Sequence, residues 1–586
     1  MEAVAAALPR TLVGSSTIAD QTGTAEFVIG PTHTRLSTRF GSLLTSRGLD
    51  EQGPWEMTVG GSLLRQRKEE ATQIAMDGWL ARRSYLDAFD PRRDKVSCLK
   101  WGGVASSVFL EFDLPELGTP TLTFDLASAS LREEAHQAPG GLPTRTVFDV
   151  WSPREPSGVR WPMTRAATET GEMGLQTYSE ARKGLACVPA SGALSAATAC
   201  FSPPPSPAAL AWPAQPFHVP FVLVDGAILF HLQLGARTAW ATLDSGAEET
   251  AVDAATEAGR TFHSLVGMTV GTATHHVEGT LGEIEGVQLG ALKTNDLVAI
   301  KLGCDACGRL EERRPEVILG LPFFSAAAVR IDYVHHDLAF AQSARSLLSG
   351  RSVPTALHVL NRQLVIDAMV AGHSASLLVD TGSANALTLA RSWGDANGLP
   401  GDAPVAHARY SVGTGEGLSD VTFFRLAHAS VGPIVANDFL ISSHDWPRGG
   451  TLAGLAGNQF FAQCSAIVVD VRERTLWLEP PCTRSSPERK LKWQLVRRES
   501  AALARNPWVV GELASGGSAA RAGIREGDRL LRVDGKEVQD DLAAVAAADA
   551  KPAGTRIQLL VDRSGQRTSV IVTLLKFLES SAPLRP

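Results

Sequence analysis

Two stretches decide the fold of this 586-residue chain: Ala241-Thr-Leu-Asp-Ser-Gly-Ala247 and Leu377-Leu-Val-Asp-Thr-Gly-Ser383. In each, an apolar run of strand length is followed at once by Asp, a hydroxyl residue and Gly. A carboxylate that directly follows a buried strand is held in a fixed position, and a glycine two residues later permits a tight turn. The two stretches therefore predict two similar strand-to-turn sites, at Asp244 and at Asp380.

A second motif repeats after the first. The run Val317-Ile-Leu-Gly320 ends 76 residues after Asp244, and Gly454-Leu-Ala-Gly457 ends 77 residues after Asp380. Each motif is followed by a pair of short apolar runs that we interpret as two strands. Landmarks in the same order at nearly equal offsets predict a duplicated β-rich unit of domain size.

The pattern predicts a specific chemistry if the two loops face each other. Two carboxyls at hydrogen-bond distance cannot both ionise cheaply, so they share one proton. The ionised partner then takes a proton from a water, and the protonated partner donates to a peptide carbonyl. The hydroxyl residues bond backbone across the two-fold axis and lock the loops. The predicted catalytic residues are Asp244, Asp380, Ser245, Thr381, Gly246 and Gly382.

These residues resemble the retropepsin-like aspartyl protease family, over residues 216 to 482. The resemblance implies that each copy is one retropepsin- or pepsin-like β-barrel lobe, that the lobes form a pseudo-dimer, and that no metal or organic cofactor is needed. The glycine-containing stretches Val270–His276 and Ser411–Gly417 lie where the family has its flaps, although the first has no aromatic residue other than histidine. The resemblance implies substrate-binding roles for Gly271, Thr272, Tyr410, Gly413 and Thr414.

The end of the chain resembles a PDZ domain. The resemblance rests on Gly516-Gly-Ser-Ala-Ala-Arg-Ala-Gly523, Gly527-Asp528 and Val533-Asp-Gly535. PDZ domains bind a peptide C-terminus as an added strand, so we expect C-terminal peptides as partners of this domain. A clear carboxylate-binding loop is missing between Lys490 and Trp508, which leaves a packing role as the alternative.

We expect a mainly β protein of five segments. They are a β-rich N-terminal domain (1–140) with a helix near 65–88, a linker rich in Pro, Ser and Gly (141–215), lobe 1 (216–348), lobe 2 (349–483) and a PDZ-like domain (490–577). The N-terminal domain weakly resembles the leading domain of bacterial chains that combine an aspartyl protease with a PDZ domain. The pairs His275-His276 and His335-His336 favour surface or packing roles over a metal site, because adjacent strand residues point to opposite faces.

Composition excludes other classes. A net charge of −7 argues against a nucleic-acid partner, and no apolar run has the roughly 18 residues of a membrane-spanning helix. Cysteines fall into local pairs, Cys187 with Cys200, Cys304 with Cys307 and Cys464 with Cys482, with Cys98 left over. These pairs and the resemblance favour a periplasmic or other extracytoplasmic location, although Met1–Arg10 does not read as a secretory signal.

The sequence thus predicts a monomeric aspartic endopeptidase that acts on peptides or unfolded proteins. Two alternatives stay open. Lobes and PDZ-like domain can form an inactive peptide-binding scaffold, because a fold does not imply a function, or each lobe pair can act together with its copy in another chain.

Overall fold

The protein is described from a computed structural model in which strands predominate and the helices are short. The structure describes residues 10–18, 21–30, 32–65, 96–101, 107–112, 121–125, 130–137, 143–148, 164–169, 172–183, 200–204, 206, 208, 210–224, 226–271, 276–304, 313–360, 362–410, 419–445, 452–482, 493–497, 508–513, 516–538, 543–549, 551–575 and 578. These residues form two compact units. The first is residues 1–210 with the short segments 266–268 and 358–362, and the second is the remainder.

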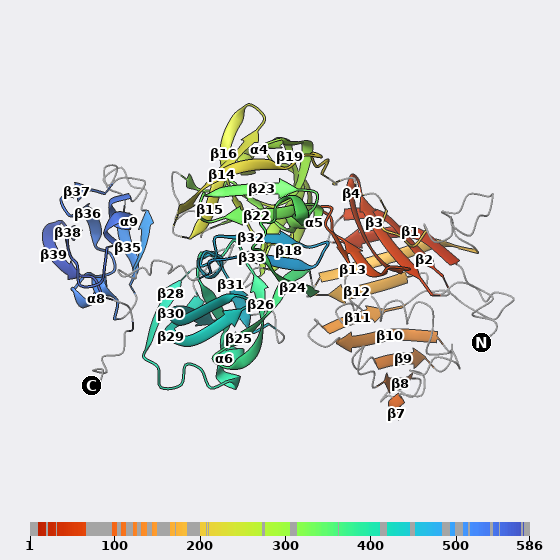
Figure 1. Ribbon diagram of the computed structural model, residues 1–586. Helices are drawn as coiled ribbons and strands as arrows, with labels where there is room; N and C mark the ends of the chain where they lie inside the picture. Colours follow the sequence, from red (N-terminus) through yellow and green to blue (C-terminus); the bar gives the residue numbers. More distant parts are fainter. Residues whose placement is uncertain are drawn as a thin grey trace. The chain divides into compact units, whose positions relative to one another are not determined.

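The first unit contains a 13-stranded sheet, with the order β6-β5-β4-β3-β2-β1-β13-β12-β11-β10-β9-β8-β7 (Figure 1). Neighbours in this sheet are also neighbours in sequence, apart from β1 and β13. The strands are β1 (Arg10–Ile18), β2 (Gln21–Ile29), β3 (Thr34–Phe40), β4 (Leu43–Asp50), β5 (Gly53–Met57), β6 (Leu63–Arg65), β7 (Val96–Trp101), β8 (Ser107–Phe112), β9 (Thr121–Asp125), β10 (Ser130–Gln137), β11 (Pro143–Val147), β12 (Thr164–Glu169) and β13 (Glu172–Lys183).

The N-terminal sheet extends beyond the boundary that the sequence predicted. Strands β11, β12 and β13 lie inside the segment assigned to the linker, and β13 pairs with β1 from Arg10↔Lys183 to Ile18↔Gly174. The linker assignment was wrong over these strands. Their many Thr, Gly and Ser residues are typical of loops, and pairing with partner strands overrides this local preference. The helix predicted near 65–88 lies outside the described residues, apart from Arg65 in β6.

The second unit begins with strands β14–β33, which hydrogen-bond into one continuous 20-stranded system. The first half has β14 (Phe217–Val224), β15 (Ala227–Leu234), β16 (Arg237–Leu243), β17 (Ala251–Asp253), α4 (Glu257–Thr261), β18 (His263–Gly271), β19 (His276–Leu289), β20 (Leu292–Leu302), β21 (Val317–Leu319), α5 (Leu321–Ala326), β22 (Ala328–Asp332), β23 (Asp337–Ala341) and the 3-10 helix η4 (Ala344–Ser346). The second half has β24 (Val353–Leu360), β25 (Gln363–Val370), β26 (His373–Val379), β27 (Leu387–Ala390), α6 (Arg391–Ala396), β28 (Val405–Tyr410), β29 (Ser419–Val431), β30 (Ile434–His444), β31 (Gly454–Ala456), α7 (Asn458–Phe461), β32 (Ala466–Asp470) and β33 (Thr475–Glu479).

The two halves share one connectivity, and we call β14–β23 lobe 1 and β24–β33 lobe 2. Strand β16 runs parallel to β21, and β26 runs parallel to β31 in the same relation. The short strands β17 and β27 likewise each pair with two strands of their own lobe, one parallel and one antiparallel. The duplication predicted from the sequence is therefore present in the strand ladders.

The lobes join through β22 and β32, which pair antiparallel from Val329↔Val469 to Asp332↔Ala466. All five residues of β32 are buried. The guanidinium of Arg330 in lobe 1 forms an ion pair with Glu479 in lobe 2 and with Asp332. Lobes 1 and 2 therefore share one core at this seam, so the loops at the ends of β16 and β26 belong to one continuous structure.

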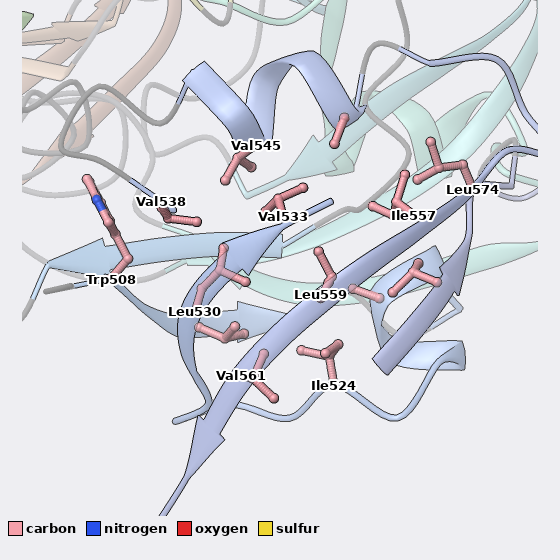
Figure 2. Packing of buried hydrophobic residues seen from close by; sticks show 14 residues of the cluster. Trp508, Ile524, Leu530, Val533, Val538, Val545, Ile557, Leu559, Val561 and Leu574 are labelled. Atoms are coloured by element: carbon pink, nitrogen blue, oxygen red, sulfur yellow. The ribbon is translucent and has the colours of Figure 1, made fainter. Parts of the chain in front are cut away.

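The C-terminal domain has its own core. Its strands are β34 (Trp493–Arg497), β35 (Trp508–Leu513), β36 (Arg529–Val533), β37 (Lys536–Glu537), β38 (Arg556–Arg563) and β39 (Gln566–Thr573), with the helices α8 (Ser518–Arg521) and α9 (Ala543–Asp549). Trp508, Leu530, Leu559 and Val561 are among the buried residues that converge between α9 and the strands (Figure 2).

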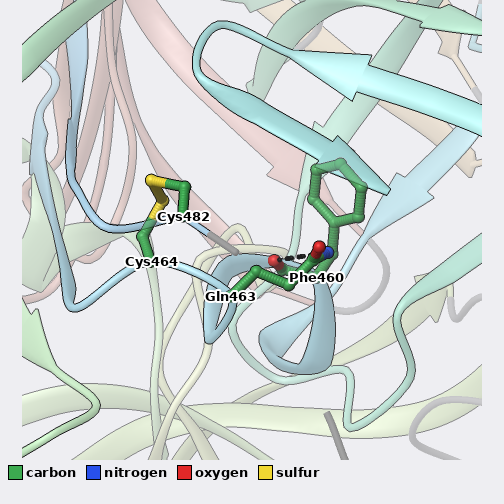
Figure 3. The surroundings of a disulfide bond; sticks show 4 residues. All are labelled: Phe460, Gln463, Cys464 and Cys482. Carbon is green, nitrogen blue, oxygen red and sulfur yellow. Dashed lines mark hydrogen bonds between the residues drawn. A yellow bond between two sulfur atoms is a disulfide. The ribbon is translucent and has the colours of Figure 1, made fainter. Parts of the chain in front are cut away.

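One disulfide closes the end of lobe 2. Cys464 precedes β32 and Cys482 follows β33, and their sulfur atoms are bonded (Figure 3). Cys464 and Cys482 are one of the three local cysteine pairs noted in the sequence, and the structure shows that this pair is bonded. Cys200 and Cys304 are disulfide-bonded as well. Within the described part of the chain, no helix combines the length and apolar character needed to cross a membrane.

Candidate active site

Two matching loops form the candidate site. Asp244 directly follows β16, and its backbone N–H donates to Leu319 O at 2.9 Å. Asp380 directly follows β26, and its N–H donates to Ala456 O at 3.0 Å. The short strands of the second motif, β21 and β31, therefore hold the start of each loop, as the repeated spacing in the sequence requires.

Each carboxylate is held by the backbone of its own loop. Oδ1 of Asp244 accepts hydrogen bonds from the N–H groups of Gly246, at 2.8 Å, and Ala247, at 3.1 Å. Oδ1 of Asp380 accepts from Gly382 and Ser383, both at 3.0 Å. Charge-assisted hydrogen bonds of this kind stabilise an ionised carboxylate and fix its orientation.

The two carboxyls lie against each other, because a Cβ on Gly246 would be 2.9 Å from Asp380 Oδ1 and 3.2 Å from Asp244 Oδ1. Burial raises the pKa of Asp244, and the backbone donors and the bond to Asp380 partly counter this. Burial, the charge of Asp244 and the hydrogen bond between them raise the pKa of Asp380 well above its usual range. The pair therefore shares one proton and titrates as a unit.

The glycines of both loops are required by close approach. A Cβ on Gly246 would lie 2.8 Å from the Asp380 carboxyl carbon, and a Cβ on Gly382 would collide with the Asp244 carboxylate. Gly320 and Gly457 of the second motif are confined in the same way, because a Cβ there would lie 2.8 Å from Ala247 O and 2.7 Å from Ser383 O respectively. Glycine is thus the residue that lets the two carboxyls meet.

The hydroxyl residues connect one loop to the other. Ser245 Oγ donates to Val379 O at 2.6 Å, and Thr381 Oγ1 donates to Leu243 O at 2.9 Å. The same oxygens accept from the opposite loop's backbone, from Thr381 N at 3.1 Å and from Ser245 N at 3.0 Å respectively. Both side chains are almost fully buried. The six residues predicted as catalytic are therefore brought together in one place.

Sequence reasoning missed two residues beneath the second loop. The buried amide of Asn458 donates from Nδ2 to Thr381 O at 2.6 Å, and its Oδ1 accepts from the Tyr333 hydroxyl at 3.0 Å. Burial raises the pKa of Tyr333, so its hydroxyl stays protonated. The only signal in the sequence was a polar residue directly after Gly457, where the first copy has Leu321.

The predicted substrate-binding residues are only partly described. Gly271 is the last residue of β18, and Tyr410 is the last residue of β28, where it pairs with Ser419. Thr272, Gly413 and Thr414 lie outside the described residues. Among the described residues, no group of three His, Cys, Asp or Glu side chains is arranged to hold a metal ion.

The C-terminal domain presents a sheet edge. Its strand order is β34-β35-β36-β38-β39, so β34 lies at one edge of the sheet as described. Such an edge offers unpaired backbone groups to an added strand. Asp528, whose carboxylate is buried, is paired with Arg563, with Nη2 to Oδ2 at 2.6 Å, and accepts from Arg525 N. This pair fixes the turn before β36.

Comparison with solved structures finds the crystal structure of Basic 7S globulin from soybean, at 12% sequence identity and a TM-score of 0.29, covering 47% of this chain and 99% of that chain. No curated protein matches the chain. The family model described as PDZ domain matches residues 509–563. This segment covers β36, α9, β38 and all of β35 except Trp508, and it contributes most of the core residues shown in Figure 2. The C-terminal part of the chain therefore contains a PDZ domain, a type of domain that mediates peptide binding.

Proposed function

We propose that the protein is an aspartic endopeptidase whose catalytic pair is Asp244 and Asp380. One observation carries this proposal: two carboxyls from duplicated loops lie against each other beside Gly246, and each is oriented by two backbone N–H groups. A purely structural pair of buried acids has no need of matched donors on both sides. Like-charged groups placed together are costly to folding and are characteristic of functional sites.

The chemistry follows from the position of the single proton. Asp244 is ionised and accepts a proton from a water held between the carboxyls, while the water oxygen bonds to the carbonyl carbon of the peptide. Asp380 gives its proton to the carbonyl oxygen, and the result is a tetrahedral diol. Return of a proton to the amide nitrogen then allows the C–N bond to break. No metal or organic cofactor takes part in this scheme.

The shared connectivity of lobes 1 and 2 supports a retropepsin-like fold for each, with the pair arranged as the two halves of a pepsin-like enzyme. In this proposal β18–β19 and β28–β29 are the flap hairpins, because Gly271 and the pair Tyr410↔Ser419 lie at the ends of their described strands. Gly271, Thr272, Tyr410, Gly413 and Thr414 then contact the substrate backbone.

The PDZ domain is proposed to recruit substrate chains by adding a peptide strand at its sheet edge. Deleting residues 490–577 is then expected to raise KM for long substrates and to leave short peptides unaffected. Unchanged substrate choice after the deletion would exclude recruitment.

Two further properties belong to the proposal. Both carboxyls come from one chain, so a monomer contains the complete catalytic pair. If the active enzyme sediments only as a dimer, this part of the proposal is contradicted. The disulfides of Cys200, Cys304 and the Cys464–Cys482 pair support an extracytoplasmic location.

The test is cleavage of a denatured protein across acid to neutral pH by wild type and by Asp380→Asn. The proposal expects new amino termini with wild type and none with the variant. A signal of equal size from both proteins would reveal a contaminating protease. If neither cleaves and both bind peptide, the lobes and the PDZ domain form a scaffold.

A further inference from the structure

The two catalytic loops differ in what lies beneath them. Leu321 and Asn458 occupy equivalent positions, each directly after the glycine of the second motif, and both are fully buried. Their backbone N–H groups form equivalent hydrogen bonds: Leu321 N donates to Ala247 O and Asn458 N donates to Ser383 O, both at 2.9 Å. Only the side chains differ, so the asymmetry lies in the buried amide.

Burying a side-chain amide costs free energy unless the amide is hydrogen-bonded. Asn458 forms one hydrogen bond through Nδ2 and another through Oδ1. A carbonyl oxygen only accepts, so the group that faces Thr381 O must be the NH₂. The hydroxyl of Tyr333 then donates to Oδ1. Tyr333 follows β22 of lobe 1, and its N–H donates to Ser465 O of lobe 2 at 3.0 Å. The bridge therefore crosses the seam between the lobes.

The bridge ends on one particular peptide plane. The carbonyl of Thr381 accepts from Asn458, and the N–H at the other end of that plane belongs to Gly382. This N–H donates to Asp380 Oδ1 and also acts on Asp244, lowering the pKa of both carboxyls. A hydrogen bond to a peptide carbonyl polarises the N–H of the same plane and strengthens its donation.

We propose that Asn458, held by Tyr333, is a positioning residue that fixes the Thr381–Gly382 peptide plane and thereby sets the proton affinity of the aspartate pair. This inference rests on the proposed function of that pair. The titratable groups that face the plane in the described residues are the two carboxyls and the Tyr333 phenol, which stays neutral. The equivalent positions in the other lobe, Leu321 and Val471, carry side chains that cannot form such a bridge.

The test compares Asn458→Leu, which installs the lobe 1 residue, with Tyr333→Phe, which removes one hydroxyl. Loss of the bridge weakens donation to the ionised pair, so its pKa rises. The acid limb of the kcat/KM profile is expected to move up by about half a pH unit in Asn458→Leu, and in the same direction by less in Tyr333→Phe. Leu321→Met is the matched control, because it disturbs packing beneath the other loop and leaves the limb in place.

A second readout does not depend on activity. Carboxyl ¹³C NMR of aspartate-labelled protein follows the titration directly, and the Asp380 signal is identified by its loss in Asp380→Asn. A wild type that does not cleave overturns the proposed function, and the NMR midpoint still decides the role of Asn458. If both variants melt at lower temperatures but their carboxyl titration midpoints equal that of wild type, the inference is overturned. Should Asn458→Leu not fold, Tyr333→Phe decides.

Discussion

Ser245 and Thr381 exchange two hydrogen bonds: the N–H of Ser245 donates to Thr381 Oγ1 at 3.0 Å, and the N–H of Thr381 donates to Ser245 Oγ at 3.1 Å. The two residues lie in different lobes, and both are buried. Each side chain therefore fixes the backbone of the other aspartate-bearing loop, and the spacing of Asp244 and Asp380 depends on both.

Thr381→Val tests this exchange. Valine keeps the shape and removes the oxygen, which leaves Ser245 N–H and Leu243 O without their partner. The free energy of unfolding is expected to fall by about 2–3 kcal/mol, measured by urea denaturation. Thr381→Ser keeps the oxygen and is the control, with a loss of about 1 kcal/mol or less. Equal losses for Val and Ser would show that the hydroxyl contributes nothing.

Gly382→Ala places a methyl group against the Asp244 carboxylate. Because the loops are locked, the carboxyls must move apart, and kcat/KM is expected to fall at least about 100-fold. Gly394→Ala in α6 is the matched control, since its Cβ would meet only ordinary contacts, the nearest at 3.8 Å. Full activity in Gly382→Ala would mean that the close approach of the two carboxyls seen in the structure is not required for catalysis.

The raised pKa of Asp380 makes a prediction about stability. The folded state holds this proton more tightly than the unfolded chain, so its contribution is full below the unfolded pKa and is lost as the pH rises through the folded pKa. Asp380→Asn does not titrate. Its melting temperature is expected to exceed that of wild type near neutral pH, with the gain vanishing near pH 4. A gain independent of pH would contradict the pKa shift.

The disulfide between Cys464 and Cys482 encloses the hairpin of β32 and β33 with a sequence separation of 18 residues. Replacing both cysteines by alanine is expected to destabilise lobe 2 by about 3 kcal/mol, because the unfolded chain regains the closed-loop entropy. Urea denaturation of the variant measures this. Alkylation of denatured, unreduced wild type counts the free thiols among its seven cysteines. One free thiol agrees with three disulfides, and seven free thiols would exclude disulfides.

Much of the site could be predicted from the sequence because its determinants are local. Asp, a hydroxyl residue and Gly follow a strand in both copies, and the second motif recurs at nearly the same offset, so the loops and their supporting strands could be paired without a structure. Gly246 and Gly382 were recognisable from turn chemistry, although their contacts with the opposite carboxyl were not.

Other features depended on distant pairing. Asn458 directly follows a motif that the sequence had already revealed, yet its bonds to Tyr333 and Thr381 join residues 125 and 77 positions away. The strand β13 was hidden for the same reason, since its composition is typical of a loop and its partner β1 lies at the other end of the domain. Local patterns carry no information about such partners.

The central claim is that Asp244 and Asp380 act together on one water. The most direct measurement is the cleavage rate of an unfolded protein substrate by wild type, Asp244→Asn and Asp380→Asn, prepared identically and compared at the pH of the wild-type maximum. The account predicts that each single substitution lowers kcat/KM by at least about 1,000-fold while the fold is retained. A variant that keeps wild-type activity would contradict it.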